Sequence, residues 1–469
     1  MKLVIAEKPS VAMALASVLG ARTRKDGYVE GNGYIVSWCV GHLVGLCDAS
    51  EYDEKYKKWR YEDLPIVPEC WKHKILEGTK KQFGILKKLM RDSKVDEVIC
   101  ATDAGREGEL IFRLVYEQAG CKKPMKRLWI SSMEEQAIKD GFASLKDGSC
   151  YDSLYQSALC RAKADWLVGI NASRLFSVLY NQNLKVGRVQ TPTLAMIVDR
   201  NQKIKEFTKE KYYMAHIKFD DMDAVTEHFQ KKEDADKVAA ECQERMCEVE
   251  KDDVKEKTVR PPKLYDLTTL QREANRMFGY TAQQTLDAVQ EMYEQKLVTY
   301  PRTDSQYLTD EMGESTETLI QMLLGKMPYA EGLEYQPDVS KVLNSKKVSD
   351  HHAIIPTMEV AKADIGKLKE RNCKILYLIS ARVLTATADP YIYESHKCQI
   401  TCNYHTFYLS AKKIKQEGFK SIENKLKQFF GVKSEKEEPE LDIWDGKHYG
   451  PCDSFVSEHF TQPPKQYTE

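Results

Sequence analysis

Tyr300 and Arg302 are the residues of this sequence whose types and spacing most clearly suit chemistry. They lie two positions apart in the segment 297–305 (LVTYPRTDS), which follows a helical pattern and turns at a proline. A tyrosine hydroxyl has an ordinary pKa of about 10, so it attacks a phosphodiester only where the developing negative charge is stabilised. The arginine fork suits a phosphate oxygen. Taken alone, this string is more commonly a buried tyrosine before a turn.

Two adjacent histidines follow in the segment 349–357 (SDHHAIIPT). His351 beside a phosphate would donate a hydrogen bond or carry positive charge. The alternative is a short capped helix with one histidine in the core. The residues of this segment leave both interpretations open.

Three acidic residues follow two apolar runs that we expect to be buried strands. Glu7 comes directly after residues 2–6 (KLVIA), and Asp103 and Glu107 lie in the segment 101–109 (ATDAGREGE). The carboxyl ends of parallel strands open onto one crevice, so these acids would converge and share a hard cation such as Mg²⁺. The alternative is that each acid caps a helix N-terminus. A nucleotide-binding P-loop does not fit, because no Gly-Lys-Ser/Thr string follows.

Basic residues concentrate between positions 161 and 211, where acids are few. Polar residues that suit a DNA backbone in this region are Arg161, Asp165, Arg174, Arg188 and Gln190. Arg188 directly follows Gly187, and Gln190 lies two positions further along the chain. A glycine at that place allows a close approach to phosphate. A solvated basic surface is the alternative.

The elements that must position these residues alternate between strand and helix in the first part of the chain, which predicts a parallel sheet. We expect strands at 2–6, 97–102 and 128–130, helices at 9–19 and 107–118, and a capping box of Ser132 and Glu135 before a further helix. The pattern is mainly helical over 159–200, strand-like over 209–257 with a helix at 234–245, and helical over 267–296. Strand patterns return from 388, with a hairpin of 396–401 and 405–410.

Composition narrows the class of protein. The chain has 469 residues, 42% hydrophobic and 30% charged, which fits a folded protein of about three domains. A net charge of −1 argues against a wholly basic coat protein, but not against an enzyme whose binding surface alone is basic. No apolar run approaches the ~20 residues that span a bilayer, and 13 scattered cysteines fit reduced thiols. We expect a cytoplasmic protein with no membrane partner.

Several strings together resemble the type IA DNA topoisomerase family, and more closely its topoisomerase III branch. They occur in the order that the family has and cover nearly the whole chain. The strings are 4–10 (VIAEKPS), 103–109 (DAGREGE), 161–174, 187–192 (GRVQTP), 269–274 (TLQREA), 300–304 (YPRTD) and 351–354 (HHAI).

This resemblance implies a multidomain α/β and α+β fold. A Toprim domain, which is a parallel α/β domain, would be joined by helical and β-rich domains to form a toroid. The implied boundaries are 1–150 for the Toprim domain, with an inserted segment around 30–65, and 151–208 for a helical segment of the DNA groove. A β-rich arch would comprise 209–265 and 388–460, and a helical domain carrying the tyrosine would comprise 266–387.

The resemblance also implies roles for single residues. Tyr300 would be the nucleophile, Lys8 and Arg302 the charges on the phosphate, and His351 a helper beside it. Glu7, itself also catalytic, would hold Mg²⁺ together with Asp103 and Glu107. DNA contacts would come from Arg161, Asp165, Arg174, Arg188, Gln190 and Thr303.

The implied activity is ATP-independent cutting of single-stranded or negatively supercoiled DNA through a 5′-phosphotyrosine, followed by strand passage and religation. Relaxation and decatenation are both open as outcomes. The setting would be a bacterial chromosome or plasmid, with a helicase as a protein partner to consider.

Two departures from the family pattern are visible. Many members have an Asp-x-Asp-x-Glu spacing, whereas Gly105 replaces the middle acid here, and Glu109 is a candidate substitute. The chain also ends at 466–469, where the family normally continues with more helical sequence and some members add a zinc-finger tail. We therefore expect a shortened protein.

Other functions remain open. A shortened chain would be a fragment that binds DNA, or one that cuts it without completing a cycle. A relaxase-type nickase also uses a tyrosine, but it needs a His-x-His metal cluster, and the two histidines are adjacent here. A zinc site at His396, Cys398, Cys402 and His405 is the weaker interpretation of a segment that also fits an exposed hairpin turning at 403–404.

Overall fold

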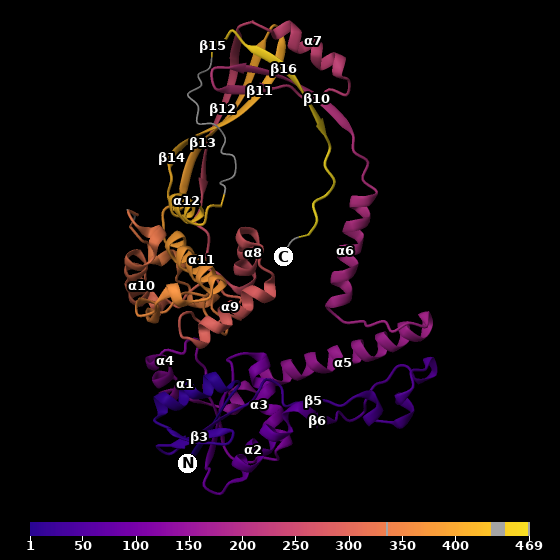
Figure 1. Ribbon diagram of the computed structural model, residues 1–469, viewed down its shortest axis with the longest axis vertical. Helices are drawn as coiled ribbons and strands as arrows, with labels where there is room; N and C mark the ends of the chain where they lie inside the picture. Colours follow the sequence, from indigo (N-terminus) through magenta and orange to yellow (C-terminus); the bar gives the residue numbers. More distant parts are fainter. Residues whose placement is uncertain (334–335, 433–445, 468–469) are drawn as a thin grey trace. The chain divides into compact units, whose positions relative to one another are not determined.

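The computed structural model describes residues 1–333, 336–432 and 446–467 and divides into two compact units (Figure 1). The first unit contains residues 1–196, 283–305 and 346–372, and the second contains 197–282, 306–345 and 373–469. The chain therefore passes between the units five times, at 196/197, 282/283, 305/306, 345/346 and 372/373. Every candidate site residue from Glu7 to His351 belongs to the first unit.

A seven-stranded sheet forms the centre of the first unit, in the order β2-β3-β4-β1-β7-β8-β9. The strands are β1 (Lys2–Ala6), β2 (Thr23–Lys25), β3 (Tyr28–Gly31), β4 (Tyr34–Trp38), β7 (Glu97–Ala101), β8 (Met125–Arg127) and β9 (Lys146–Asp147). β4, β1, β7 and β8 run parallel, and the edge strands are antiparallel. β1 is apolar after its first residue because it is buried on both faces. A small ribbon of β5 (Val44–Leu46) and β6 (His73–Ile75) lies outside this sheet.

Helices cover the sheet and complete one apolar core, which gathers residues from Leu3 to Leu159. They are α1 (Pro9–Leu19), α2 (Lys80–Arg91), α3 (Arg106–Gln118), α4 (Glu135–Ala143) and the long α5 (Asp152–Tyr180). α6 (Gln190–Lys205) leads into the second unit, and α9 (Ala282–Glu294) returns to the first. The strands predicted at 2–6 and 97–102 and the helices predicted at 9–19 and 107–118 are confirmed, within a residue at each end.

Two local predictions are wrong. The third strand lies at Met125–Arg127 rather than at 128–130, because Arg127 occupies it as a buried residue. The capping box of Ser132 and Glu135 is not formed: α4 begins after Glu134, and the Ser132 hydroxyl instead bonds with Glu134.

An antiparallel sheet dominates the second unit, in the order β15-β12-β13-β14-β11-β10-β16. Its strands are β10 (Lys211–Phe219), β11 (Met222–Val225), β12 (Cys247–Val259), β13 (Tyr391–Cys402), β14 (His405–Gln416), β15 (His448–Tyr449) and β16 (Asp453–Phe460). α7 (Lys232–Cys242) packs on one face, and the predicted hairpin turns at Asn403 and Tyr404, both with positive φ. Of the expected arch 388–460, residues 433–445 lie outside the described residues.

The remaining helices are α8 (Leu267–Phe278), α10 (Gly313–Lys326), α11 (Glu370–Ala386) and α12 (Phe419–Phe429). The helix predicted over 267–296 is two helices, because Gly279 ends α8 in the left-handed region with φ 68°. Across the described part of the chain, no helix combines the length and the apolar character that crossing a membrane would require.

Candidate active site

Glu7 and Asp103 come together at the carboxyl ends of two neighbouring parallel strands. β1 pairs with β7 so that Ala6 lies opposite Ala101, Glu7 follows β1 directly, and one residue separates Asp103 from the end of β7. The Asp103 backbone N–H donates to Glu7 Oε2 at 3.3 Å. Asp103 is only 8% exposed, and its Oδ2 is buried without a hydrogen bond from any described residue. A buried anionic oxygen of this kind favours a cation beside it.

Burial raises the pKa of both carboxyl groups. Burial and then the charge of Asp103 raise the pKa of Glu7 to about 7. Burial likewise raises the pKa of Asp103, against the charges of Lys8 and Arg302. Without a cation, Glu7 is therefore about half protonated at neutral pH.

Glu107 does not join this pair. Its carboxylate lies 3.4 Å from His42 Nε2 and 3.1 Å from Arg161 Nη1, and these partners lower its pKa against the effect of burial. Among the described residues, no three His, Cys, Asp or Glu side chains are grouped so that they could hold a metal ion. The structure thus supplies two carboxylates at one place, and the third predicted ligand stands apart.

Glu109 does not take the place of the acid that Gly105 replaces. Its carboxylate is 1% exposed and pairs with Arg127 at 3.0 Å and with Arg113 at 2.8 Å. Both carboxylate oxygens are therefore paired with arginines inside the protein and do not face the acidic site.

Arg127 is a structural residue of the site that the sequence reasoning missed. Its buried guanidinium donates to the carbonyls of Cys100, Thr102, Asp103 and Leu128. Together with Glu109 it fixes the turn that presents Asp103. Gly108 closes the same turn, since a Cβ there would lie 2.0 Å from the Asp103 carbonyl oxygen. The available signal was an arginine directly before the apolar run 128–130.

Tyr300 is buried in the first unit, at the end of a short extended segment. Thr299 pairs with Ile355 through the backbone, and the Tyr300 N–H donates to the Ser131 carbonyl at 3.0 Å. Its ring packs against Tyr293 (centroids 5.4 Å apart) and His351 (4.3 Å). Burial and then the charge of Asp103 raise the pKa of Tyr300, whereas Arg302 opposes this through its charge and a hydrogen bond. The hydroxyl is therefore protonated in this form.

Helix α9 holds the two cations predicted for the phosphate. Lys8 Nζ donates to Glu294 Oε1 at 3.1 Å, and Arg302 Nη1 donates to Gln290 Oε1 at 3.1 Å. Arg302 Nη1 also lies 3.9 Å from Asp103 Oδ2. Glu294 and Gln290 were missed because nothing in the local spacing links Lys8 to a residue 286 positions away.

His351 is buried and neutral. Its Nε2 donates to the Ala104 carbonyl, and the Ser131 hydroxyl donates to Nδ1 at 2.7 Å. Burial lowers the pKa of His351 to about 4, so it carries no charge at neutral pH. Thr303, predicted to contact DNA, is buried and donates to the His351 carbonyl at 3.0 Å.

The predicted groove residues divide into two sets. Arg161, Asp165 and Arg188 form an exposed chain of ion pairs, with Arg188 Nε 2.6 Å and Arg161 Nε 3.8 Å from Asp165. Gln190 is also exposed, at the first position of α6. Arg174, in contrast, is buried and stacks over Trp59 with its guanidinium carbon 5.4 Å from the ring centroid.

The alternative zinc residues bind other partners. His396 Nδ1 lies 2.7 Å from Asp252 and His405 Nε2 lies 2.6 Å from Glu241, both carboxylates. His396, Cys398 and Cys402 are buried in the second sheet rather than on an exposed hairpin. Among the described residues, the four side chains do not form a group that could hold a metal ion.

Family models match both parts of the chain. A Toprim domain model matches residues 2–133, and a DNA topoisomerase model matches residues 149–469, more than half of the chain. The chain belongs to the DNA topoisomerase family. The predicted resemblance to type IA topoisomerases of the topoisomerase III branch is confirmed by these matches and by the relatives below.

Relatives with this name are similar over most of the chain. DNA topoisomerase 3 of Staphylococcus haemolyticus is 38% identical over 100% of this chain and 65% of its own length. DNA topoisomerase 3 of Bacillus cereus is 43% identical over 89% of this chain and 59% of its own length. The chain thus spans less than two thirds of the length of these relatives.

A solved structure has the same topoisomerase fold. Full-length topoisomerase I from Thermotoga maritima matches with a TM-score of 0.74 and 24% identity, over 99% of this chain and 73% of that one. The predicted combination of a Toprim domain with helical and β-rich parts is confirmed.

Proposed function

We propose that this chain cuts and rejoins single-stranded DNA through a transient covalent bond between Tyr300 and a phosphate. The observation that carries the proposal is the convergence in one unit of a buried tyrosine hydroxyl, Arg302 and the carboxyl pair of Glu7 and Asp103. A structural tyrosine would not need a cation and two acids with perturbed protonation beside its hydroxyl.

Glu7 and Asp103 fit a magnesium ion. Mg²⁺ is commonly held by one or two carboxylates, with waters and substrate phosphates completing its shell, and Asp103 Oδ2 is buried without a hydrogen-bond donor among the described residues. When bound, the ion would supply positive charge to the phosphate. Glu107 as a third ligand stays a prediction, and it would first have to leave Arg161.

The reaction is a transesterification. The Tyr300 oxygen forms a bond to phosphorus, and the bond from phosphorus to the 3′ oxygen breaks. The tyrosine stays joined to the 5′ phosphate of the downstream fragment, and the upstream fragment leaves with a 3′ hydroxyl. The tyrosine proton must leave, and the 3′ oxygen must gain one. Glu7 is suited to exchange these protons while no ion is bound to it, because its pKa is then about 7. Religation reverses the step and needs no ATP, since the ester bond is conserved.

Arg302 and Lys8 are suited to stabilise the charge that develops on the phosphate oxygens. In this structure their partners are Gln290 and Glu294, so a bound phosphate would replace these contacts. His351 has both ring nitrogens engaged and is neutral, so its role is to orient the Tyr300 ring and the Ala104 carbonyl. The exposed residues Arg161, Arg188 and Gln190 would follow the strand.

A labelled single-stranded oligonucleotide tests the proposal. Incubation with the protein and Mg²⁺, followed by denaturation, is expected to leave a covalent complex that Tyr300→Phe abolishes. Tyr293→Phe is the matched control, because it removes a hydroxyl from a buried neighbouring ring and should leave the complex intact. A complex that persists in Tyr300→Phe would exclude this residue as the nucleophile.

The same assay separates the alternatives. Cleavage with no relaxation of a negatively supercoiled plasmid would indicate a chain that cuts without completing a cycle, and binding without cleavage would indicate a DNA-binding fragment. A relaxase-type nickase is not favoured, because His351 and His352 bond to backbone carbonyls. Action on a bacterial chromosome or plasmid in the cytoplasm, and cooperation with a helicase, follow from the family resemblance and stay predictions.

A further inference from the structure

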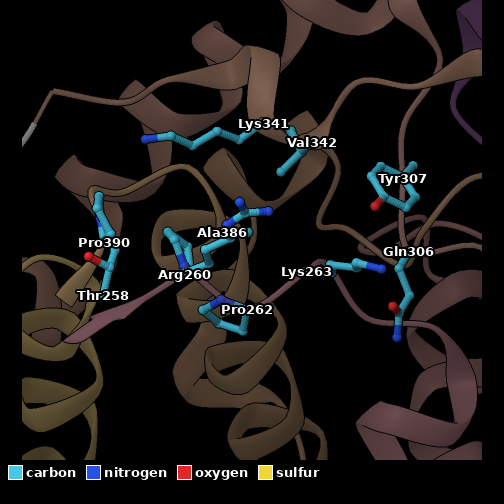
Figure 2. Close-up of a pocket in the computed structure, with 11 residues that line it drawn as sticks. Thr258, Arg260, Pro262, Lys263, Gln306, Tyr307, Lys341, Val342, Ala386 and Pro390 are labelled. Carbon is cyan, nitrogen blue, oxygen red and sulfur yellow. The ribbon is translucent and has the colours of Figure 1, made fainter. Parts of the chain in front are cut away.

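A pocket of about 440 Å³ lies within the second unit, where none of its lining residues belongs to the candidate active site. Four separate stretches of chain form it: the end of β12 with the following prolines, residues 306–307, residues 341–342, and residues 386 and 390 (Figure 2). Its volume is within the range of small-ligand sites, roughly 300–1,000 Å³.

Three basic residues lie in the wall of the pocket, and one of them, Lys341, is paired with Asp338 and Asp389 outside the wall. Arg260, Lys263 and Lys341 line it, and no acid does. Lys341 is already engaged, since its Nζ donates to the Ala388 carbonyl at 3.0 Å and lies 3.5 Å from Asp389. Arg260 has no hydrogen bond or ion pair to any other described residue, and its side chain lies between Val342 and Ala386 in Figure 2. A five-donor fork in such a place suits a phosphate group.

Another part of the wall, around Lys263, is partly aromatic. Lys263 Nζ lies 5.3 Å from the centroid of the Tyr307 ring, so this ammonium rests on the ring face. Gln306 donates through Nε2 to Asp266 at 3.1 Å, which directs its amide oxygen to accept from another group. Pro262, Val342 and Ala386 supply apolar surface.

The basic side chains and the aromatic ring together suit the phosphate and the base of a single nucleotide. A phosphate would draw Lys263 off the Tyr307 ring towards Arg260, and the uncovered ring face would then stack on a base. Aromatic stacking of this kind accepts any base, and the Gln306 oxygen would favour bases with an exocyclic amine.

We propose that this pocket is a second nucleotide-binding site, which holds a phosphate at Arg260 and Lys263 and a base at Tyr307. The shared chemistry is a nucleoside monophosphate unit, supplied either by a free nucleotide or by one residue of a DNA strand. The site does not depend on the proposed cleavage, because it shares no residue with the Tyr300 centre.

Isothermal titration calorimetry of the full chain tests the site. The ligands are deoxyadenosine monophosphate, inorganic phosphate and a twelve-residue oligodeoxyadenylate. In Tyr300→Phe protein, which cannot cleave, we expect binding that Arg260→Gln and Lys263→Gln each weaken tenfold or more. Arg245→Gln is the matched control, because Arg245 is exposed in the same unit but does not line the pocket, and it should leave binding unchanged. Phosphate alone should bind more weakly than the nucleotide, and Tyr307→Ala should remove that difference.

The outcomes separate the sources of the nucleotide. Arg260-dependent binding of the monophosphate identifies a site for free nucleotides, and Arg260-dependent binding of the oligonucleotide alone identifies a contact for the DNA strand. Either result supports the site, whatever the cleavage assay shows. Binding to the Tyr300→Phe protein that Arg260→Gln leaves unchanged, or that Arg245→Gln weakens equally, would overturn it. So would phosphate binding as tight as nucleotide binding.

Discussion

Glu7 is the residue whose protonation links the candidate site to pH. Its pKa in the folded chain is about 7, above its ordinary value of 4.5, because it is buried beside Asp103. A carboxyl group whose pKa is raised by folding favours the folded state below its unfolded pKa, and this advantage is lost as the pH rises through the folded pKa. Stability is thus lost as the pH rises from 4.5 to 7, and above pH 7 the ionised pair destabilises the first unit unless a cation is present.

Glu7→Gln is therefore expected to stabilise the chain at pH 8 in EDTA, by about 1–3 kcal/mol, and by much less at pH 5. Urea unfolding at both pH values measures this difference. Glu77→Gln is the control, because Glu77 is fully exposed and its pKa is lowered, so it offers no such gain. An equal change at both pH values would show that Glu7 does not have a raised pKa.

Adding Mg²⁺ should reverse the order of stability. The unmodified chain should gain stability at pH 8 through binding of the ion to Glu7 and Asp103, whereas Glu7→Gln should gain little. Because the carboxyl groups must be ionised to bind a cation, the gain should shrink as the pH falls below 7. Thermal unfolding across a magnesium titration, at pH 6 and pH 8, measures it. A gain that is equal in both proteins would place the ion elsewhere.

The first residues of α3 are the element that sets the acidic site. Gly105 precedes the helix in an extended conformation with φ 176°, which any residue adopts, and a Cβ built there meets nothing within 4 Å. An aspartate therefore fits at this position without rearrangement. Gly108 differs, because a Cβ there would collide with the Asp103 carbonyl.

Gly105→Asp is expected to lower the Mg²⁺ concentration needed for half-maximal cleavage, by about threefold to tenfold, because it adds a carboxylate to the crevice. Gly105→Asn is the control of matched shape, and both side chains can cap α3 equally well. The effect is assigned to charge only if the asparagine variant behaves like the unmodified chain. A magnesium requirement unchanged by aspartate would show that position 105 does not face the ion.

Regular elements were predictable from the sequence where side-chain type and burial agree. β1 and β7 are apolar strands and α1 begins at a proline, so these elements were placed within a residue. The prediction placed β8 too late in the chain because arginine is an unlikely core residue by type. Arg127 is nevertheless buried in β8, where it donates hydrogen bonds to four backbone carbonyls and pairs with Glu109. The helical pattern over 267–296 includes Gly279, but this glycine ends α8 in the structure.

The candidate site shows the same division. The principal side chains could be named in advance because each stands in a distinctive string. Their partners could not: Glu294 reaches Lys8 only through the tertiary fold, and Ser131 meets His351 across 220 positions. The neutral form of His351 depends on burial, which no local pattern reveals.

At the scale of the whole molecule, the first unit is assembled from three stretches of chain. Its sheet and apolar core draw only on residues 1–162, whereas Tyr300 and His351 arrive in the stretches 283–305 and 346–372.

A fragment of residues 1–163 is therefore expected to fold by itself, because it keeps the complete sheet and core. Circular dichroism should show one cooperative thermal transition, and the fragment should form no covalent complex with DNA. Leu15→Ala in the fragment, which opens a cavity in the buried face of α1, should lower the transition temperature by an amount that corresponds to roughly 2–5 kcal/mol. A fragment without a cooperative transition would show that the later stretches are needed for the sheet.

The five passages between units have a consequence for synthesis. The acidic crevice is complete when about the first third of the chain has emerged, and Tyr300 follows more than a hundred residues later. At typical bacterial rates of roughly 5–20 residues per second, that interval is on the order of ten seconds. A ribosome that stalls in this interval would release a chain that has the acidic crevice but lacks Tyr300, so an interrupted message produces no protein that could form the proposed phosphotyrosine.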